Sequence, residues 1–240
     1  MTAPHEIHRP RSTLAFEKTL ASYGALADAD LAAARSVLGA LQSHPPDKQI
    51  GRGGRGGDEP LVVVEGWVGA VEPLEDGRRQ IVALFIAGDV LDPSIDCAAG
   101  LTATTLTAAW TMPAGALRAA VEAGCAGDGL RRAWRAARAA ADARLVRQVV
   151  RLGRMSALER TAEFILELLD RQQRSGLARN GRIDLPLTQE VLADHLGLSV
   201  VHMNRTLQQL RREGLIVYRA GCLLIPDPDR LARAAPRAAA

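Results

Sequence analysis

The chain has 240 residues, of which 48% are apolar and 24% are charged, and its formal net charge is +3. This length and composition are typical of a globular protein of one or two domains, and they exclude disorder over most of the chain. The best apolar runs, such as residues 81–87, are far shorter than the ~20 residues of a membrane-spanning helix, so no membrane partner is expected.

The first half of the sequence changes from helical to strand-like patterns. Residues 11–43 predict helix, and His44-Pro45-Pro46 ends the pattern. The Gly/Arg run over residues 51–57 predicts a flexible loop in place of a barrel turn, with an RNA-binding segment as the alternative. Five short β-prone runs follow between turn residues, which predicts a small antiparallel barrel or sandwich; they are residues 61–65, 67–71, 79–87, 101–106 and 108–112.

A long helix is predicted over residues 127–152, after a short one over 114–123. The long helix carries one apolar stripe over about six turns, formed by Leu130, Trp134, Ala137, Ala141, Leu145, Val149 and Leu152. A stripe of this length needs a partner of similar length, and we predict a homodimer in which a second copy supplies it. The alternative is a helix that packs across its own barrel.

A helix-turn-helix is predicted over residues 187–214, which read LTQEVLADHLGLSVVHMNRTLQQLRREG. Before it, Ser156 and Glu159 form a capping box that begins a helix, and Gly153 marks the domain boundary. Thr188 and Ser199 are N-cap residues for two short helices, and Gly197 permits the turn between them. His195, in the first of these helices, is predicted to lie on the helix surface.

The second helix has an apolar side and a polar side. Met203, Leu207 and Leu210 should face the core, whereas Val201, Arg205, Gln208 and Arg212 lie on the opposite side, flanked by His202 and Gln209. This outer side has cationic and amide groups and no acid, which suits phosphates and base edges. A solvated face of an ordinary helical hairpin is the alternative. A β-hairpin with a glycine turn follows over residues 215–225, and it completes a winged helix.

The run from Leu187 to Ile216 resembles the C-terminal domain of Crp/Fnr-type bacterial transcription regulators. Arg78-Arg79-Gln80-Ile81, with Gly88-Asp89 after it, resembles the N-terminal β-roll of that family, and the long helix lies where the family has its dimer helix. The resemblance covers residues 15–228. It implies an α+β protein with a cyclic-nucleotide-binding-like antiparallel β-roll, a long dimerisation helix and a C-terminal winged helix-turn-helix.

The resemblance also implies a set of DNA-contacting residues. Many family members carry a Glu near position 200 or 201, where this chain has valines, so no carboxylate stands there to accept from a cytosine amino group. Together with their neighbours on the two helices, the predicted DNA-binding residues are Thr188, Gln189, Ser199, Val200, Val201, His202, Asn204, Arg205 and Gln208.

No cofactor is expected. A cyclic nucleotide needs a cation or a set of backbone amides for its phosphate, and the chain has no Lys, Arg or His between Gln80 and Leu117, where Asp89, Asp92 and Asp96 would repel an anion. The family's iron–sulfur branch uses N-terminal cysteines, and here Cys97 is the first. The histidines are dispersed, at His5, His8 and His44, so no metal site is expected. The sequence also has no recognisable pair of nucleophile and base, so we do not expect an enzyme.

We therefore predict a cytoplasmic, dimeric, sequence-specific transcription regulator that binds an inverted-repeat operator in double-stranded DNA and contacts RNA polymerase. Three widely spaced cysteines and an N-terminus without an apolar segment favour the cytoplasm. The alternative is a ligand-sensing or protein-interaction module whose winged helix binds a protein. The predicted domains are a sensor over residues 1–126, a linker helix over 127–153, the DNA-binding domain over 154–228 and a tail over 229–240.

Overall fold

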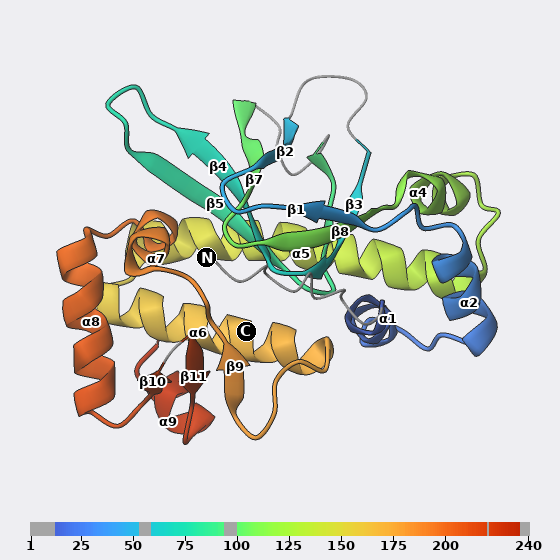
Figure 1. Cartoon of the computed structure of the whole chain (residues 1–240). Helices are drawn as coiled ribbons and strands as arrows, with labels where there is room; N and C mark the ends of the chain where they lie inside the picture. Colours follow the sequence, from blue (N-terminus) through green and yellow to red (C-terminus); the bar gives the residue numbers. More distant parts are fainter. Residues whose placement is uncertain (1–12, 53–58, 94–99, 220, 236–240) are drawn as a thin grey trace, which may run out of the picture.

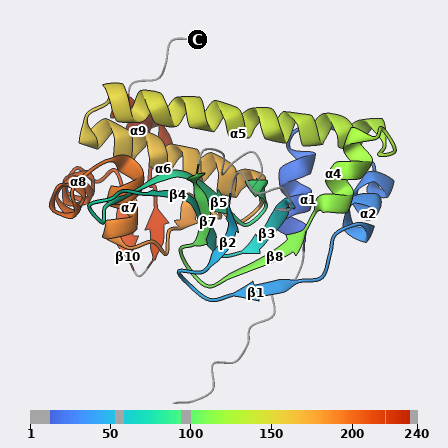
Figure 2. The same cartoon turned by 90° about the horizontal axis from the view of Figure 1, so that it is seen from above.

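The computed structural model describes residues 13–52, 59–93, 100–219 and 221–235. A β-roll and a winged-helix unit lie on the same side of one long helix, α5 (Figures 1 and 2). The Gly/Arg run lies almost wholly outside the described residues, as do His5, His8, Asp96 and Cys97. The helices are α1 (Leu14–Ala21), α2 (Asp28–Ser36), α4 (Gly115–Glu122), α5 (Asp128–Arg154), α6 (Ala157–Arg174), α7 (Gln189–Leu196), α8 (Val200–Arg212) and α9 (Pro228–Arg233).

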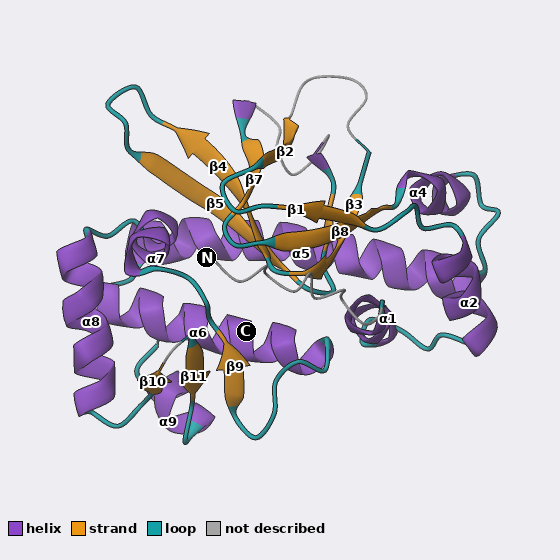
Figure 3. Cartoon of the chain, in the orientation of Figure 1, coloured by secondary structure: helices purple, strands orange, loops and turns teal. Residues whose placement is uncertain are grey.

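The β-roll consists of two four-stranded antiparallel sheets, with strand orders β1-β8-β3-β6 and β2-β7-β4-β5 (Figure 3). Its strands pair mostly with partners distant in sequence, apart from the β4–β5 hairpin, whose turn contains Gly77 at φ +84°. The predicted antiparallel architecture is confirmed. The strands are β1 (Gln42–His44), β2 (Gln49–Arg52), β3 (Leu61–Glu65), β4 (Trp67–Pro73), β5 (Arg79–Ile86), β6 (Val90–Leu91), β7 (Thr102–Thr105) and β8 (Ala109–Pro113).

The prediction of helix over residues 11–43 is wrong in part. The chain there forms two short helices, α1 and α2, which are separated at Ser22–Ala27, and then strand β1. His44, which the sequence places at the end of the helical pattern, lies in a strand, where it pairs with Ala109. Strands as short as β1, β2 and β6 have too few residues to show an alternating pattern, and for this reason the sequence did not predict them.

The apolar stripe predicted along α5 divides between two environments. Leu130, Trp134 and Ala141 are buried against the chain's own helices and β-roll, and Leu145 lines a small cavity beside β5. Burial within one copy contradicts the prediction that Leu130, Trp134 and Ala141 form a dimer seam, whereas Leu145 is half-buried and its role in a dimer stays a prediction. The exposed large apolar residues of α5 are Val146, Val149 and Val150, with exposed fractions of 66%, 70% and 42%.

The winged-helix unit comprises residues 157–235. Helices α6, α7 and α8 pack on a three-stranded sheet of order β10-β11-β9, formed by β9 (Arg182–Asp184), β10 (Val217–Arg219) and β11 (Cys222–Leu224). The capping box at Ser156 and Glu159 is present. Strand β9 was not predicted. Residues 229–235 are not a separate tail, because α9 buries Leu231 in the core of the unit.

One hydrophobic core extends across the predicted domain boundary. Trp67, Val71 and Ile81 of the β4–β5 hairpin belong to the same buried cluster as Phe164 of α6 and Leu196 of α7. The winged-helix unit is therefore packed directly on the β-roll, in addition to its covalent connection through α5.

Candidate nucleic-acid interface

Helices α7 and α8 form the helix-turn-helix that the sequence predicts. The Thr188 hydroxyl accepts a hydrogen bond from the Val191 amide at 3.2 Å, and the Ser199 hydroxyl accepts one from the His202 amide at 3.2 Å. These caps begin both helices by satisfying free first-turn amides. Gly197 adopts the left-handed conformation at φ +63°, which ends α7 and allows the chain to turn.

Helix α8 presents one polar face to solvent. Met203, Leu207 and Leu210 are buried as predicted, and their side chains fix α8 on the rest of the unit. Several of the predicted DNA-binding residues are exposed; they are Thr188, Ser199, Val200, Val201, His202, Arg205 and Gln208. No acidic residue occurs between Ser199 and Arg212, so the face is suited to a polyanion.

Three side-chain amides form a hydrogen-bonded row across the two helices. The Asn204 amide donates to the Gln189 side-chain oxygen at 2.8 Å, and the Gln208 amide donates to the Asn204 side-chain oxygen at 2.7 Å. Asn204 thus uses both ends of its amide within the protein. It orients Gln189 and Gln208, and it has less capacity than either neighbour to hydrogen-bond a base.

The wing is anchored by Tyr218. Its hydroxyl donates to the carbonyl oxygens of Leu185 and Leu187 at 3.1 and 3.4 Å, immediately before Thr188. Partial burial raises the pKa of the Tyr218 hydroxyl, which keeps it a donor. Arg219 at the end of β10 is exposed, so the wing adds a cation next to the helix-turn-helix.

The turn between α7 and α8 is held by side chains from three other elements. The His195 carbonyl, one of the last in α7, accepts from Gln148 of α5 at 2.6 Å and from Gln80 of β5 at 3.2 Å. The Leu196 carbonyl accepts from Arg160 of α6 at 3.1 Å. Carbonyls at a helix C-terminus lack partners within the helix, so these contacts satisfy groups that would otherwise need water.

His195 is buried, with an exposed fraction of 4%, and the prediction of a surface position is wrong. Its Nδ1 atom lies 2.9 Å from the Ile81 carbonyl, and because a carbonyl only accepts, the ring donates. Burial lowers the pKa of His195 to about 4, although the Ile81 hydrogen bond acts in the opposite direction. The spacing of His195 from Leu192, three residues, was a signal that the two share the buried face.

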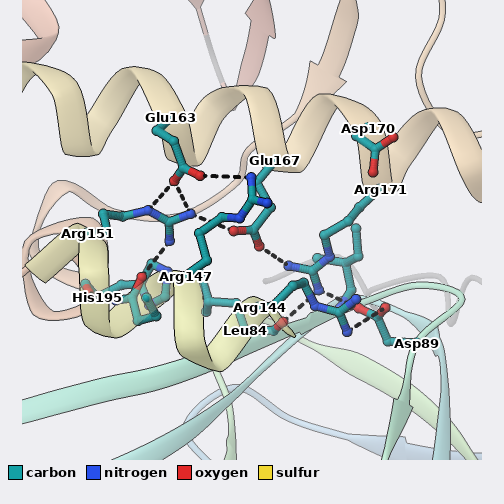
Figure 4. Close-up of polar contacts among 12 residues, drawn as sticks. Leu84, Asp89, Arg144, Arg147, Arg151, Glu163, Glu167, Asp170, Arg171 and His195 are labelled. Atoms are coloured by element: carbon teal, nitrogen blue, oxygen red, sulfur yellow. Dashed lines mark hydrogen bonds and ion pairs between the residues drawn. The ribbon is translucent and has the colours of Figure 1, made fainter. Parts of the chain in front are cut away.

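A buried network of charged residues joins α5, α6 and the β-roll (Figure 4). Arg151 of α5 donates to Glu163 at 2.5 Å and to Glu167 at 2.6 Å, both on α6. Arg171 of α6 donates to the Leu84 carbonyl at 2.6 Å and to Asp89 at 2.5 Å. Sequence reasoning missed this network, because its members are separated by up to 87 positions in the chain.

Arginines set the charge state of the Glu167 carboxyl. Burial alone would raise its pKa, but Arg171 and Arg151 outweigh burial and hold the pKa below its usual value. Glu167 therefore stays ionised as the partner of both arginines.

Two acidic residues of the β-roll, Asp89 and Asp92, are paired within the chain. Asp89 contacts Arg171, and Asp92 contacts Arg118 at 2.9 Å, so neither is the free repelling charge that the sequence indicated. The cavity between β5, α5, α6 and α7 has a volume of about 30 Å³, which has room for one or two water molecules. Within the described ranges, no three His, Cys, Asp or Glu side chains group as metal ligands.

Comparisons with known proteins match the C-terminal third of the chain to a domain family and most of the chain to known regulators. The model of the Crp-like helix-turn-helix domain matches residues 159–234. The nitrogen fixation regulation protein FixK of Bradyrhizobium diazoefficiens is 33% identical over 178 residues, which cover 70% of each chain. The FixK protein of Rhizobium meliloti is 28% identical over 192 residues, covering 80% of this chain and 85% of that protein.

The fold is also similar to solved structures. FixK2 from Bradyrhizobium japonicum superposes with a TM-score of 0.70 and 28% identity, covering 83% of this chain and 98% of that one. In the part of this chain that the structure describes, no helix has the length and apolar character needed to cross a membrane.

Proposed function

Because the chain belongs to the Crp/Fnr family of transcription regulators, we propose that it binds its operator as a two-fold symmetric dimer, with α8 of each copy in a major groove. The observation that carries this proposal is the exposed, acid-free face of α8 around Arg205. Helix α8 lies at the end of the molecule where α5 ends, away from α2 and α4 (Figures 1 and 2). Two copies related by an axis along α5 would then present both α8 helices toward the same side.

The dimer contact that we propose is the exposed face of the C-terminal half of α5. This helix runs along one edge of the molecule, with the β-roll and the winged-helix unit on its other side (Figure 2). Its exposed apolar positions, Val146, Val149 and Val150, follow the three- and four-residue spacing of a helix-pairing stripe. A second copy of the same helix is an occupant of matching length and pattern.

Dimer symmetry determines the form of the operator. Two recognition helices related by a two-fold axis meet an inverted repeat, with half-site centres about 10–10.5 bp apart. On each half-site, Arg205 can bind guanine O6 and N7 with both arms of its guanidinium, and the exposed Val201 can contact a thymine methyl. Phosphate contacts from the wing and the other arginines would add affinity without sequence preference.

Selection of bound sites from a random duplex library tests this function. The full chain should enrich an inverted repeat, with affinity that falls steeply as salt is raised, because bound phosphates release counterions. The proposal fails if no sequence is enriched and binding is insensitive to salt. That result would favour the alternative, in which the winged helix binds a protein.

Two further parts of the proposal concern partners and effectors. We propose that the chain contacts RNA polymerase and acts in the cytoplasm; a relative that is 37% identical over 84 residues is named the transcriptional activatory protein AadR of Rhodopseudomonas palustris. We also propose that no iron–sulfur cluster and no cyclic nucleotide is needed. The proposal that no cyclic nucleotide is needed rests on the absence of any Lys, Arg or His from Gln80 to Leu117.

A further inference from the structure

We propose that strand β5 of the β-roll positions the helix-turn-helix, and that Arg79, Gln80 and the Ile81 carbonyl are its anchors on α7. This inference rests on the proposed two-site mode of DNA binding. It concerns how the position of α8 is set, because α7 and α8 are packed in one hydrophobic core and are joined by the Asn204–Gln189 hydrogen bond. Arg79, Gln80 and Ile81 are consecutive residues, and each makes a polar contact with α7.

The first anchor is an ion pair between the two units. Arg79 Nε donates to the Asp194 carboxylate at 2.7 Å, and both side chains are only partly exposed, at 32% and 22%. Partial shielding from solvent makes such a pair stronger than a fully exposed one.

The second and third anchors converge on His195. Gln80 donates its side-chain amide to the His195 carbonyl, and the His195 ring donates to the Ile81 carbonyl. Gln148 of α5 donates to the same His195 carbonyl at 2.6 Å. One residue at the end of α7 is thus fixed from the β-roll and from α5 together.

Farther along the same interface, Arg171 of α6 contacts Asp89 and the Leu84 carbonyl (Figure 4). Asp89 is itself tied to β5, because it accepts from the Ile86 amide at 2.8 Å. Polar contacts at both ends of β5, with the shared hydrophobic core between them, restrict rotation of the winged-helix unit about the α5–α6 junction.

A fixed orientation has a measurable consequence for DNA. Inserting one base pair between half-sites moves one half-site by about 3.4 Å and rotates it by about 35°. Rigidly held α8 helices cannot follow this change, so the dimer should discriminate strongly between the two spacings. Loosely held α8 helices should discriminate less, although each still binds its own half-site.

The experiment compares two adjacent arginines. Arg79→Asp breaks the pair with Asp194, whereas Arg78→Asp makes the same charge change and breaks a pair with Asp76 inside the β4–β5 hairpin. For each full-length variant, affinity is measured for the duplex selected by the unaltered chain, for the same duplex with one inserted base pair, and for a single half-site. A third variant, Gln80→Leu, removes the donor to the His195 carbonyl at similar volume.

We expect Arg79→Asp to lower the ratio of affinities for the selected and the inserted duplex by about fivefold. Gln80→Leu should lower the ratio in the same direction. Arg78→Asp should leave the ratio unchanged, and the affinity for a single half-site should be unchanged in all three variants. The double variant that exchanges the two charges, Arg79→Asp with Asp194→Arg, should restore the ratio.

The inference is overturned if the ratio stays constant in Arg79→Asp and Gln80→Leu, or if Arg78→Asp lowers it equally. It is also overturned if half-site affinity falls as much as operator affinity, because the contact would then only stabilise the fold. Failure of the unaltered chain to select an inverted repeat would instead contradict the proposed function.

Discussion

Arg205 and Val201 lie one helical turn apart on the exposed face of α8, and their side chains differ in what they can distinguish. The valine can only contact a methyl group, whereas the planar guanidinium of Arg205 matches two acceptors on one guanine. The neighbouring amides are less free, because Asn204 is hydrogen-bonded to both Gln189 and Gln208. Arg205 is therefore the side chain that we expect to contribute most to base recognition.

Arg205→Ala should remove the preference at one position of each half-site, with a loss of ~1–3 kcal/mol of discrimination. Non-specific affinity should fall little. Arg212→Ala is the matched control on the same face of the helix: as a phosphate contact, it should weaken all sequences alike and reduce the salt slope by about 1. Competition binding against single-base operator variants distinguishes the two, and an unchanged ranking of variants in Arg205→Ala would disprove base reading.

His195 should make stability depend on pH. Its pKa is about 4 in the fold and near 6.5 when unfolded. The unfolded chain therefore binds the proton first as the pH falls from about 6.5 to about 4, and stability is lost over this window.

Between pH 7 and pH 5 the expected loss from His195 is about 2 kcal/mol in the free energy of unfolding. His195→Gln keeps a donor for the Ile81 carbonyl and cannot titrate, so it should lack this part of the loss. Urea unfolding at the two pH values measures the difference. Equal losses in the variant and the unaltered chain would mean that His195 is not the responsible group.

At the scale of elements, the winged-helix unit was predictable because its determinants are local. The caps at Ser156, Thr188 and Ser199 and the turn at Gly197 each act within a few residues of their position. The α5 helix was predictable, but the partner of its stripe was not, since the same pattern suits a β-roll or a second copy. Only the three-dimensional structure shows that Leu130 is buried within one copy whereas Val149 is exposed.

The contacts between units could not be predicted from spacing. Arg79 and Asp194, or Arg171 and Asp89, are brought together only when the β-roll and the winged-helix unit pack. Nothing in the sequence near Arg171 distinguishes it from the exposed arginines of the same chain. The short strands β1, β2, β6 and β9 depend in the same way on partners supplied by distant segments.

Replacing Val146 and Val149 together by Glu tests the role of α5. In the proposed dimer the four introduced carboxylates would be buried without partners, which is costly, so the variant should sediment as a monomer. Leu177→Glu, at an exposed apolar position outside α5, should leave the dimer intact. A persistent dimer in the double variant would place the contact elsewhere.

The β-roll should not respond to cyclic AMP. No cationic side chain occurs from Gln80 to Leu117, and Arg118, the next one, contacts Asp92. Calorimetry with millimolar cyclic AMP should therefore show no saturable heat. A dissociation constant in the micromolar range would contradict this expectation.

At the scale of the whole molecule, the β-roll, α5 and the winged-helix unit share polar contacts around His195 and form one packed body. The position of α8 relative to α5 is therefore a property of the whole fold. In the proposed dimer along α5, the two α8 helices would have a fixed separation and opposite directions. Symmetric DNA is the target that fits this arrangement.

The symmetric mode of DNA binding is tested by the affinity of the full-length chain for two duplexes that contain the same selected half-sites. In one duplex the half-sites form an inverted repeat with centres about 10.5 bp apart, and in the other they form a direct repeat at the same separation. We expect the inverted repeat to bind about 100-fold more tightly, because only it engages both α8 helices. Equal affinity for the two duplexes would contradict the two-fold symmetric dimer and the mode of DNA recognition derived from it.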